Sequence, residues 1–288
     1  MPSRALPLAD LLSLQRISPT ELLGPASHEP HVRAFGGQVA AQAVVAAGHS
    51  VDPGRSVHSL HAYFLRPGRP TSPIRYRVDP LRDGRSFSVR RVTALQDDDV
   101  LLEMTTSFHT DERGVEHQGA APEVPEPEAL APFVERFAGR DDPADMERWF
   151  VRAGSFDVRY VDRSPFEAPV PAHPAIQRVW FRYTGPTPPE DVVHAGILTY
   201  ASDMTMLDAI LLRHGMSWTD RAILGASLDH AMWFHRPVEA GEWLLFDQAS
   251  PVAGGGRGFA TAQVWDRAGR LVASIAQEAL LRPPKQFA

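Results

Sequence analysis

The chain has 288 residues, of which 43% are hydrophobic and 22% charged, a composition typical of a soluble globular protein with one or two domains. A net charge of −6 disfavours nucleic-acid binding, because nucleic-acid-binding proteins usually carry a basic excess. The absence of cysteine excludes disulfides, thiolate metal sites and a cysteine nucleophile. Residues 1–14 lack a signal-peptide core, and no apolar run reaches about 18 residues. We therefore expect a soluble cytoplasmic protein that binds neither nucleic acid nor membrane.

The first half of the chain has the pattern of one helix followed by four strands. Gly36 and Gly37 precede a run of small apolar residues that extends to Gly48, and this dense spacing predicts a buried helix. Alternating segments joined by short turns such as Asp83-Gly84 predict antiparallel strands. The expected strands are residues 57–68, which end in Pro-Gly, and residues 74–81, 86–95 and 100–108.

Residues 111–153 are rich in Pro, Glu and Ala and lose the alternation of the strands. This composition predicts a linker that contains a short helix near Pro143–Arg152. We therefore expect an N-terminal domain at residues 1–110 and a C-terminal domain at residues 154–288.

The second half repeats the order of the first half. Tyr200–Asp203 is expected to open a helix that ends at His214-Gly215. Strands are expected at residues 229–234, 242–249, 259–266 and 271–281. Equal spacing supports a duplication, since Pro67 precedes Ser107 by 40 residues and Pro237 precedes Gln277 by 40 residues.

A helix wrapped by an antiparallel sheet, used twice, predicts the α+β class and the double hotdog, in which two hotdog domains follow one another. A curved sheet must bury one face, and one apolar helix can fill it. Two such units can join their sheets edge to edge, which removes an exposed strand edge.

Six segments form a combined pattern that is more specific than any one of them: Phe35–Gln38, His58–Gly68, Leu81–Ser88, Ser202–Asp203, Asp229–Pro237 and Ala276–Glu278. The pattern resembles the type II acyl-CoA thioesterase family and covers most of the chain outside the linker. The resemblance implies two hotdogs in tandem and hydrolysis of fatty acyl-CoA to fatty acid and CoA, without a cofactor. It also implies a homodimer or a larger homo-oligomer.

The resemblance further implies three catalytic residues, Asp203, Ser227 and Gln277. The family has Thr where this chain has Ser227, which keeps the hydroxyl and loses only a methyl group. Thioester hydrolysis needs a water, a base and donors for the oxyanion. At the expected helix start, Asp203 would be a charged base, while Ser227 and Gln277 would hold the same water. Unpaired N–H groups of that helix start would bind the carbonyl oxygen.

An Asp in the first turn of a helix often serves stability alone. Asp208 is a second carboxylate nearby, but five residues along a helix it would point away from Asp203. The repeat places Gln38, Val57 and Ser107 opposite the three catalytic positions, so the first half lacks the carboxylate. We expect one working site per chain, with the N-terminal copy serving as scaffold and substrate tunnel.

The strand motifs contain histidines at positions 58, 61, 230 and 235, but their spacing places them on different strand faces and suggests no metal site. Ser227 could be a covalent nucleophile, although the chain has no G-x-S-x-G motif and no histidine obviously placed to activate it. The run Gly254–Gly258 is expected to be a hairpin loop. Candidate partners for the phosphates of CoA are Arg66, Arg85, Arg90, Arg91, Arg236 and Arg257.

Two other functions stay open. One is a hotdog hydratase or dehydratase of enoyl thioesters, which usually uses an Asp/His pair, and no histidine is expected near Asp203. The other is a protein that binds acyl-CoA without hydrolysing it. The acyl chain length is not readable from the sequence.

Overall fold

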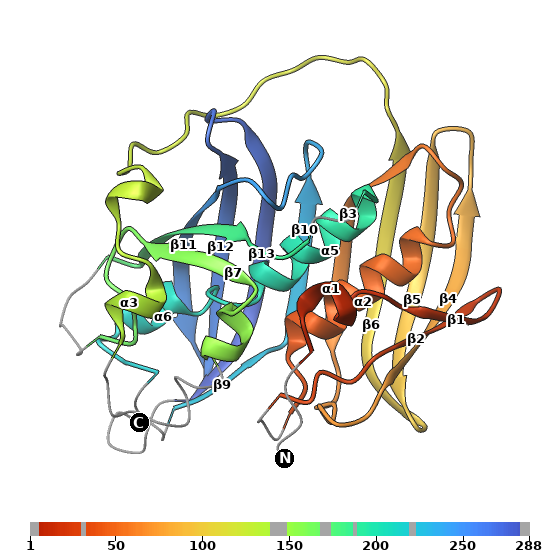
Figure 1. Cartoon of the computed structure of the whole chain (residues 1–288), viewed down its shortest axis with the longest axis horizontal. Helices are drawn as coiled ribbons and strands as arrows, with labels where there is room; N and C mark the ends of the chain where they lie inside the picture. Colours follow the sequence, from red (N-terminus) through yellow and green to blue (C-terminus); the bar gives the residue numbers. More distant parts are fainter. Residues whose placement is uncertain are drawn as a thin grey trace.

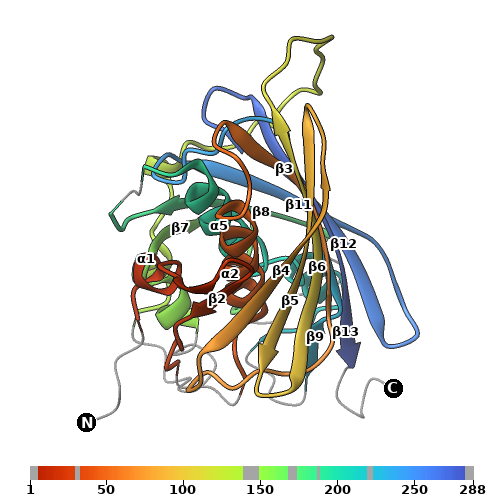
Figure 2. The ribbon, with the colours of Figure 1, turned by 90° about the vertical axis from the view of Figure 1, so that its right-hand side faces the viewer.

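The computed structural model describes residues 6–29, 33–138, 149–167, 174–186, 189–218 and 223–282. Its main feature is one antiparallel sheet of 13 strands, which carries the two longest helices on the same face (Figures 1 and 2). The strand order is β1-β2-β4-β5-β6-β3-β10-β13-β12-β11-β8-β7, and β9 pairs with β13.

The first half of the chain forms one end of this sheet, with strands β2 and β4 to β6 curving around a central helix (Figure 2). Its elements are α1 Leu8–Leu11, β1 Gln15–Ser18, β2 Glu21–Gly24, α2 Gly36–Gly48, β3 Arg55–Phe64, β4 Ile74–Asp83, β5 Phe87–Gln96 and β6 Asp99–Thr110. The four strands expected here and the buried helix are confirmed. Strands β1 and β2 were not expected, because two runs of four residues are too short for alternation to show.

The second half forms the other end of the sheet. Its described elements are η1 Pro127–Ala129, α3 Phe133–Arg136, β7 Phe156–Tyr160, β8 Ile176–Tyr183, α5 Asp191–Ser202, α6 Asp208–Arg213, β9 Leu224–Ser227, β10 Asp229–Phe234, β11 Leu244–Gly254, β12 Arg257–Asp266 and β13 Leu271–Arg282. The four expected strands are confirmed as β10 to β13. The Gly-rich run lies in the turn between β11 and β12, as expected for a hairpin loop.

The expected helix start at Tyr200–Asp203 is wrong. The helix α5 begins at Asp191 and ends at Ser202, so Asp203 caps its C-terminal end, and the shorter α6 begins only at Asp208. The segment before Tyr200 is rich in β-branched residues, which have lower helix propensity, yet every residue from Val193 to Ser202 is buried. Burial in the core therefore overrides the local preference.

The two halves join through β3 and β10, which pair antiparallel from Asp229 opposite Tyr63 to Trp233 opposite Ser59. The pairing makes the two half-sheets continuous and removes an edge from each. The helices α2 and α5 also pack together, and a Cβ on Gly196 of α5 would lie 2.8 Å from the Val45 side chain of α2. A single hydrophobic core therefore extends across both halves.

The connecting segment, residues 111–153, is bound to the second half. Its first part arches over one end of the sheet from the first half to the second (Figure 1), and Gln118 bonds both Gly269 O and Leu271 N. Trp180 Nε1 donates to Pro125 O, within an apolar cluster that includes Trp243 and Trp265. The later part of the segment contributes to the main core through Phe133, Phe137 and Trp149. Residues 149–153 are helical, and residues 143–148 of the expected short helix lie outside the described residues.

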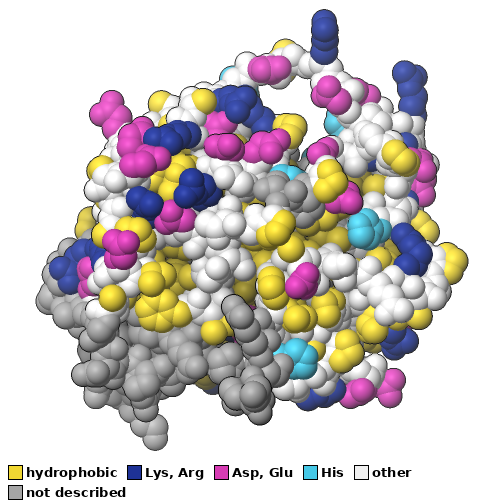
Figure 3. All heavy atoms as spheres, viewed as in Figure 1, with side chains coloured by type: hydrophobic (Ala, Val, Ile, Leu, Met, Phe, Trp, Pro, Cys, Tyr) yellow, Lys and Arg dark blue, Asp and Glu magenta, His cyan; other side chains and the backbone are white. Residues whose placement is uncertain are grey.

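In the part of the chain that the structure describes, no helix combines the length and the apolar character needed to cross a membrane. On the face of the molecule in Figure 3, basic and acidic side chains are interspersed among exposed apolar ones. Several of the basic side chains are paired with acids, for example Arg267 with Glu126 and Glu128.

Candidate active site

Asp203 lies at the C-terminal end of α5 and is 9% exposed. The C-terminal end of a helix carries a partial negative charge, so the dipole of α5 does not favour a carboxylate there. We expected the helix of Asp203 to stabilise its charged form and to offer N–H groups to the substrate. Both expectations are wrong, because Asp203 lies at the C-terminal end of α5.

A helix from the first half faces this carboxylate instead. A Cβ placed on Gly36, the first residue of α2, would lie 2.8 Å from Asp203 Oδ2 and 3.1 Å from the Phe64 ring. The N-terminal end of α2 carries a partial positive charge, which stabilises a nearby anion. The first intrahelical hydrogen bond runs from Val39 N to Phe35 O, so the N–H groups of residues 36–38 precede the hydrogen-bonded part of the helix.

The three residues expected at the site meet in one cluster. Ser227, the last residue of β9, donates from Oγ to Asp203 Oδ1 at 2.7 Å. Gln277 on β13 donates from Nε2 to Asp203 Oδ1 at 3.1 Å and to Ser227 Oγ at 2.8 Å. Strand pairing holds Ser227 in this place, since it lies opposite Ala279 on the same strand that carries Gln277.

The two oxygens of Asp203 have different surroundings. Oδ1 accepts both hydrogen bonds, one from Ser227 and one from Gln277. Oδ2 receives no hydrogen bond from the described residues and faces the start of α2. A carboxylate held in this way can accept a hydrogen from a water through Oδ2 while Oδ1 stays fixed.

His230 belongs to the same cluster and was not expected there. Its ring contacts Gln277 Oε1 through Nδ1 at 2.5 Å and Ser202 Oγ through Nε2 at 2.8 Å, and the residue is 1% exposed. Burial lowers the pKa of His230, and the nearby charge of Asp203 opposes this shift. The expectation that no histidine lies near Asp203 is therefore wrong, although His230 forms no hydrogen bond with Ser227 among those of the described residues.

A signal for His230 was present in the sequence. In β10, His230, Met232 and Phe234 are buried, whereas Trp233 between them is partly exposed. This alternation of two places His230 on the inner face of the strand. What the sequence does not show is that β13 brings Gln277 to the same face beside it.

The other strand histidines lie apart from the cluster. His58 Nε2 is 2.8 Å from Ser107 Oγ, His61 packs against Trp233, and His235 Nε2 is 2.9 Å from Ser274 Oγ. Within the described residues, no group of three or more His, Asp or Glu side chains is arranged to hold a metal ion.

Five of the six candidate arginines are engaged by the protein itself. Arg90 is buried and bonds both Ser50 and Asp83, which identifies it as a structural residue. The other four contacts are Arg66 with Asp99, Arg91 with Asp79, Arg236 with Leu271 O and Arg257 with Glu278.

Asp208 is fully buried and lies outside the cluster, as the sequence indicated. Tyr160 Oη donates to Asp208 Oδ2 at 3.0 Å, and Trp218 Nε1 donates to Oδ1 at 2.9 Å. Burial raises the pKa of Asp208 to about 7. The Trp218 ring in turn lies 3.2 Å from the place of a Cβ on Gly225, so Asp208 supports the strand that carries Ser227.

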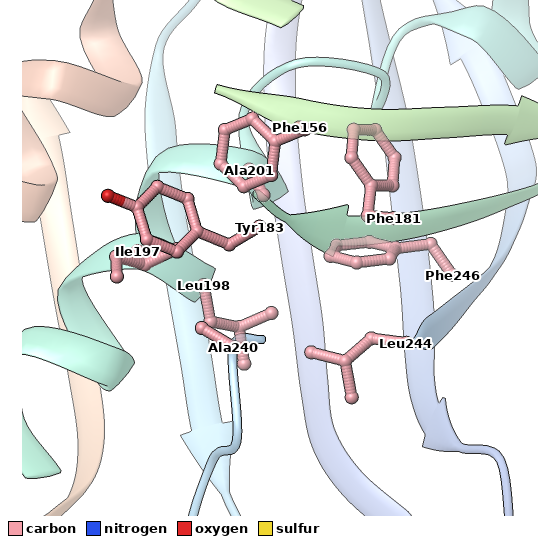
Figure 4. A pocket seen from close by; sticks show the side chains of 9 residues that line it. All are labelled: Phe156, Phe181, Tyr183, Ile197, Leu198, Ala201, Ala240, Leu244 and Phe246. Atoms are coloured by element: carbon pink, nitrogen blue, oxygen red, sulfur yellow. The ribbon is translucent and has the colours of Figure 1, made fainter. Parts of the chain in front are cut away.

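A small apolar cavity lies beside α5 in the second half (Figure 4). Ile197, Leu198 and Ala201 of α5 form one wall, and aromatic rings from β7, β8 and β11, such as Phe181 and Phe246, form the others. Ala201 precedes Asp203 by two residues, so the cavity and the polar cluster adjoin the same end of α5. An apolar lining of this kind suits a hydrocarbon chain.

Comparison with known proteins identifies the family of the chain. Family models match both halves, "Acyl-CoA thioesterase N-terminal domain" at residues 25–109 and "Acyl-CoA thioesterase C-terminal domain" at residues 125–281. The chain is 35% identical to acyl-CoA thioesterase 2 of Haemophilus influenzae, over 96% of each protein. It is 34% identical to human acyl-coenzyme A thioesterase 8, over 98% of this chain and 91% of the human protein.

Solved structures agree in fold. An acyl-CoA thioesterase II, TesB2, from Mycobacterium marinum aligns with a TM-score of 0.80 and 39% identity, over 97% of this chain and 99% of that one. A hot dog fold protein from Alicyclobacillus acidocaldarius aligns with a TM-score of 0.78 at 21% identity, over 96% of this chain and 98% of that one. The fold and the sequence matches together define a hotdog-fold thioesterase. The chain belongs to the type II acyl-CoA thioesterase family.

Proposed function

We propose that this chain hydrolyses fatty acyl-CoA to free fatty acid and CoA at a single site formed by Asp203, Ser227 and Gln277. The observation that carries the proposal is the arrangement around Asp203. Ser227 and Gln277 hold Oδ1 at 2.7 and 3.1 Å, while Oδ2 faces the start of α2. Membership of a thioester hydrolase family supports the same reaction.

In the proposed mechanism, a water donates one hydrogen to Asp203 Oδ2 and the other to Ser227 Oγ, which has a free lone pair. The lone pair of the water oxygen is then directed at the thioester carbon. As the carbon–oxygen bond forms, Asp203 takes the proton as a general base. The tetrahedral intermediate expels CoA as a thiolate, which takes up the proton that Asp203 had accepted, and the carboxylic acid product remains.

The carbonyl oxygen gains negative charge in this step and needs donors. The N–H groups of residues 36–38, which have no hydrogen-bond acceptor among the described residues, lie at the end of α2 that faces Asp203 Oδ2, and the positive end of the helix favours the oxyanion. The first half therefore contributes directly to the site, beyond the scaffold role expected from the sequence. It still lacks a carboxylate opposite Asp203, so we retain one working site per chain.

This arrangement supports the double hotdog, with one unit at residues 1–110, a linker at residues 111–153 and a second unit at residues 154–288. In the first unit α2 lies on the inner face of the half-sheet, and in the second unit α6 packs on β8, β11 and β12 while the end of α5 meets Phe181 and Phe246. The apolar side chains that line the small cavity beside α5 are the proposed contacts of the acyl chain. A homodimer or a larger homo-oligomer in the cytoplasm is part of the proposal, and light scattering and cell fractionation test it.

A second candidate reaction is favoured by one observation. His230 and Asp203 both contact Gln277, so an Asp and a His occur at one site, as in hydratases and dehydratases of enoyl thioesters. Such an enzyme would interconvert enoyl-CoA and hydroxyacyl-CoA and release no CoA. The measured product therefore separates the two reactions.

The test is release of free CoA from saturated acyl-CoAs of increasing length, with wild type beside Asp203→Asn. The substitution keeps the shape and removes the base, and we expect kcat to fall by about 10²–10⁴-fold. Asp208→Asn is the matched control, because it changes a buried carboxyl five residues away. No CoA release by wild type would refute hydrolysis and favour the hydratase or a binding protein. Equal activity of wild type and Asp203→Asn would refute the assigned base.

A further inference from the structure

The contacts of Gln277 with Asp203 and His230 fix the orientation of its side-chain amide. At its other end the amide faces Asp203 Oδ1 and Ser227 Oγ, at 3.1 and 2.8 Å. A carboxylate only accepts hydrogen bonds, so Nε2 must point to Asp203 and Oε1 to His230. This orientation requires a hydrogen on Nδ1 of His230, because a bare nitrogen would set two acceptors 2.5 Å apart.

Ser202 lies at the other nitrogen of the His230 ring. Its Oγ lies 2.8 Å from His230 Nε2 and 2.8 Å from Thr199 O. A neutral ring that carries its hydrogen on Nδ1 has a bare Nε2, so in this form the single hydrogen of Ser202, which can also reach Thr199 O, is donated to Nε2. Burial lowers the pKa of His230, with Asp203 and Asp229 opposing, which keeps the ring neutral at neutral pH.

The pair is enclosed by protein. His230 and Gln277 are each 1% exposed, and Ser202 has no exposed surface. Water therefore cannot replace a partner that is lost, and without His230 only the contacts with Asp203 and Ser227 would hold the amide of Gln277. A turned amide places Oε1 against the carboxylate of Asp203, which repels it.

We propose that His230 is a positioning residue, whose hydrogen bond from Nδ1 fixes the amide of Gln277 so that its N–H groups hold Ser227 and Asp203. This role rests on the proposed thioesterase function. His230 touches neither water nor substrate in this mechanism. It acts through Gln277, and its loss should lower kcat with little change in KM.

Two substitutions of similar polarity separate this role from simple packing. In His230→Asn, the side-chain nitrogen takes the place of Nδ1 and can still donate to Gln277. In His230→Gln, the nitrogen takes the place of Nε2 and reaches Ser202 instead. We expect His230→Asn to keep kcat within about 5-fold of wild type, and His230→Gln to lose about 100-fold, the scale of a misplaced catalytic group. KM should change by less than about 3-fold in both.

Thermal unfolding of both variants is the accompanying measurement. If His230 served only packing, kcat would fall in proportion to the loss of stability. His230→Asn and His230→Gln would then have similar kcat values. Equal kcat values in two variants that both fold, or a loss confined to KM, would overturn the proposal.

A second readout does not depend on turnover. In protein labelled with ¹⁵N-histidine, the His230 ring is identified among the 12 histidines by its disappearance in His230→Asn. We expect the Nδ1–H form at neutral pH, and the Nε2–H form would overturn the proposal. If wild type releases no CoA, the proposed function fails, while this spectrum still decides the orientation of the amide.

Discussion

Asp203 and Gly36 meet across the junction between the two halves of the chain, with the carboxylate Oδ2 2.8 Å from the place that a Cβ on Gly36 would occupy. Asp203 follows α5 in the second half, and Gly36 begins α2 in the first half. The paired strands β3 and β10 and the packed helices α2 and α5 hold this approach in place. The site is therefore a product of both halves, although the carboxylate comes from one.

Gly36→Ala tests this relationship. The added methyl would crowd Asp203 Oδ2 at 2.8 Å and the Phe64 ring at 3.1 Å, so the carboxylate must move. Alanine is a better helix former than glycine, so helix propensity alone would stabilise the variant. We expect kcat for acyl-CoA hydrolysis to fall about 100-fold, on the scale of a misplaced group.

The control for this substitution is Gly68→Ala, whose added methyl would meet Leu101 and Ala34 at 2.9 and 3.2 Å. These contacts are comparably tight but involve no residue of the cluster, so stability should change and kcat should not. A Gly36→Ala enzyme with wild-type kcat would contradict the assembly of the site from both halves.

Ser227 is tested by a pair of substitutions. Ser227→Thr keeps the hydroxyl that donates to Asp203 Oδ1 at 2.7 Å and adds the methyl group of the family pattern, so we expect kcat within about 3-fold of wild type. Ser227→Ala removes both this donor and the acceptor of the Gln277 amide, and we expect a loss of about 10- to 100-fold.

Ser227→Thr and Ser227→Ala also distinguish attack of water on the thioester carbon from covalent attack by Ser227. A nucleophilic Ser227 would leave no turnover in Ser227→Ala and would give an acyl-enzyme in wild type. The hydroxyl hydrogen is donated to Asp203, and His230 contacts Gln277 instead of Ser227. We therefore expect residual turnover in Ser227→Ala and no acyl adduct by mass spectrometry of wild type during turnover.

The strands could be predicted from the sequence because their signals are local, whereas the meeting of Asp203, Ser227 and Gln277 was expected from the family resemblance. Alternation and turn residues mark β3 to β6 and β10 to β13, and the motifs place Asp203 and Gln277. Strand β8 was missed because five of its eight residues are buried, including three in succession, Val179 to Phe181, so alternation is lost. The approach of Gly36 to Asp203, and of His230 to Gln277, depends on packing between distant segments and has no local signal.

A buried ion pair ties the connecting segment to the first half. Arg152 Nε lies 3.0 Å from Glu29 Oε2, and its guanidinium lies 4.2 Å from the centre of the Phe35 ring, next to the start of α2. The Glu29 side chain is 3% exposed, so removing its partner leaves a buried charge. We expect Arg152→Met to lower the free energy of unfolding by about 3 kcal/mol, measured by urea denaturation.

The double variant Glu29→Gln/Arg152→Met is the matched control, because it removes both charges. Replacing a buried pair by uncharged groups is often close to neutral, so this variant should regain most of the lost stability. If the double variant were no more stable than Arg152→Met, the cost would come from the lost packing of Arg152 on Phe35 and not from the stranded charge.

Asp208 gives the protein a stability that depends on pH. Burial raises its pKa from 3.8 in the unfolded chain to about 7 in the fold, so the folded state binds the proton more tightly. A group with a raised pKa contributes its full stability below pH 4 and loses it as the pH rises to 7 and above. Relative to Asp208→Asn, which carries no charge at any pH, the wild type should lose at most about 4 kcal/mol between pH 4 and pH 8.

The amide can still accept from Trp218 Nε1 and donate to Tyr160 Oη, so the variant should fold. The measurement is urea denaturation of both proteins at several pH values, and parallel profiles would show that Asp208 is charged in the fold across this range.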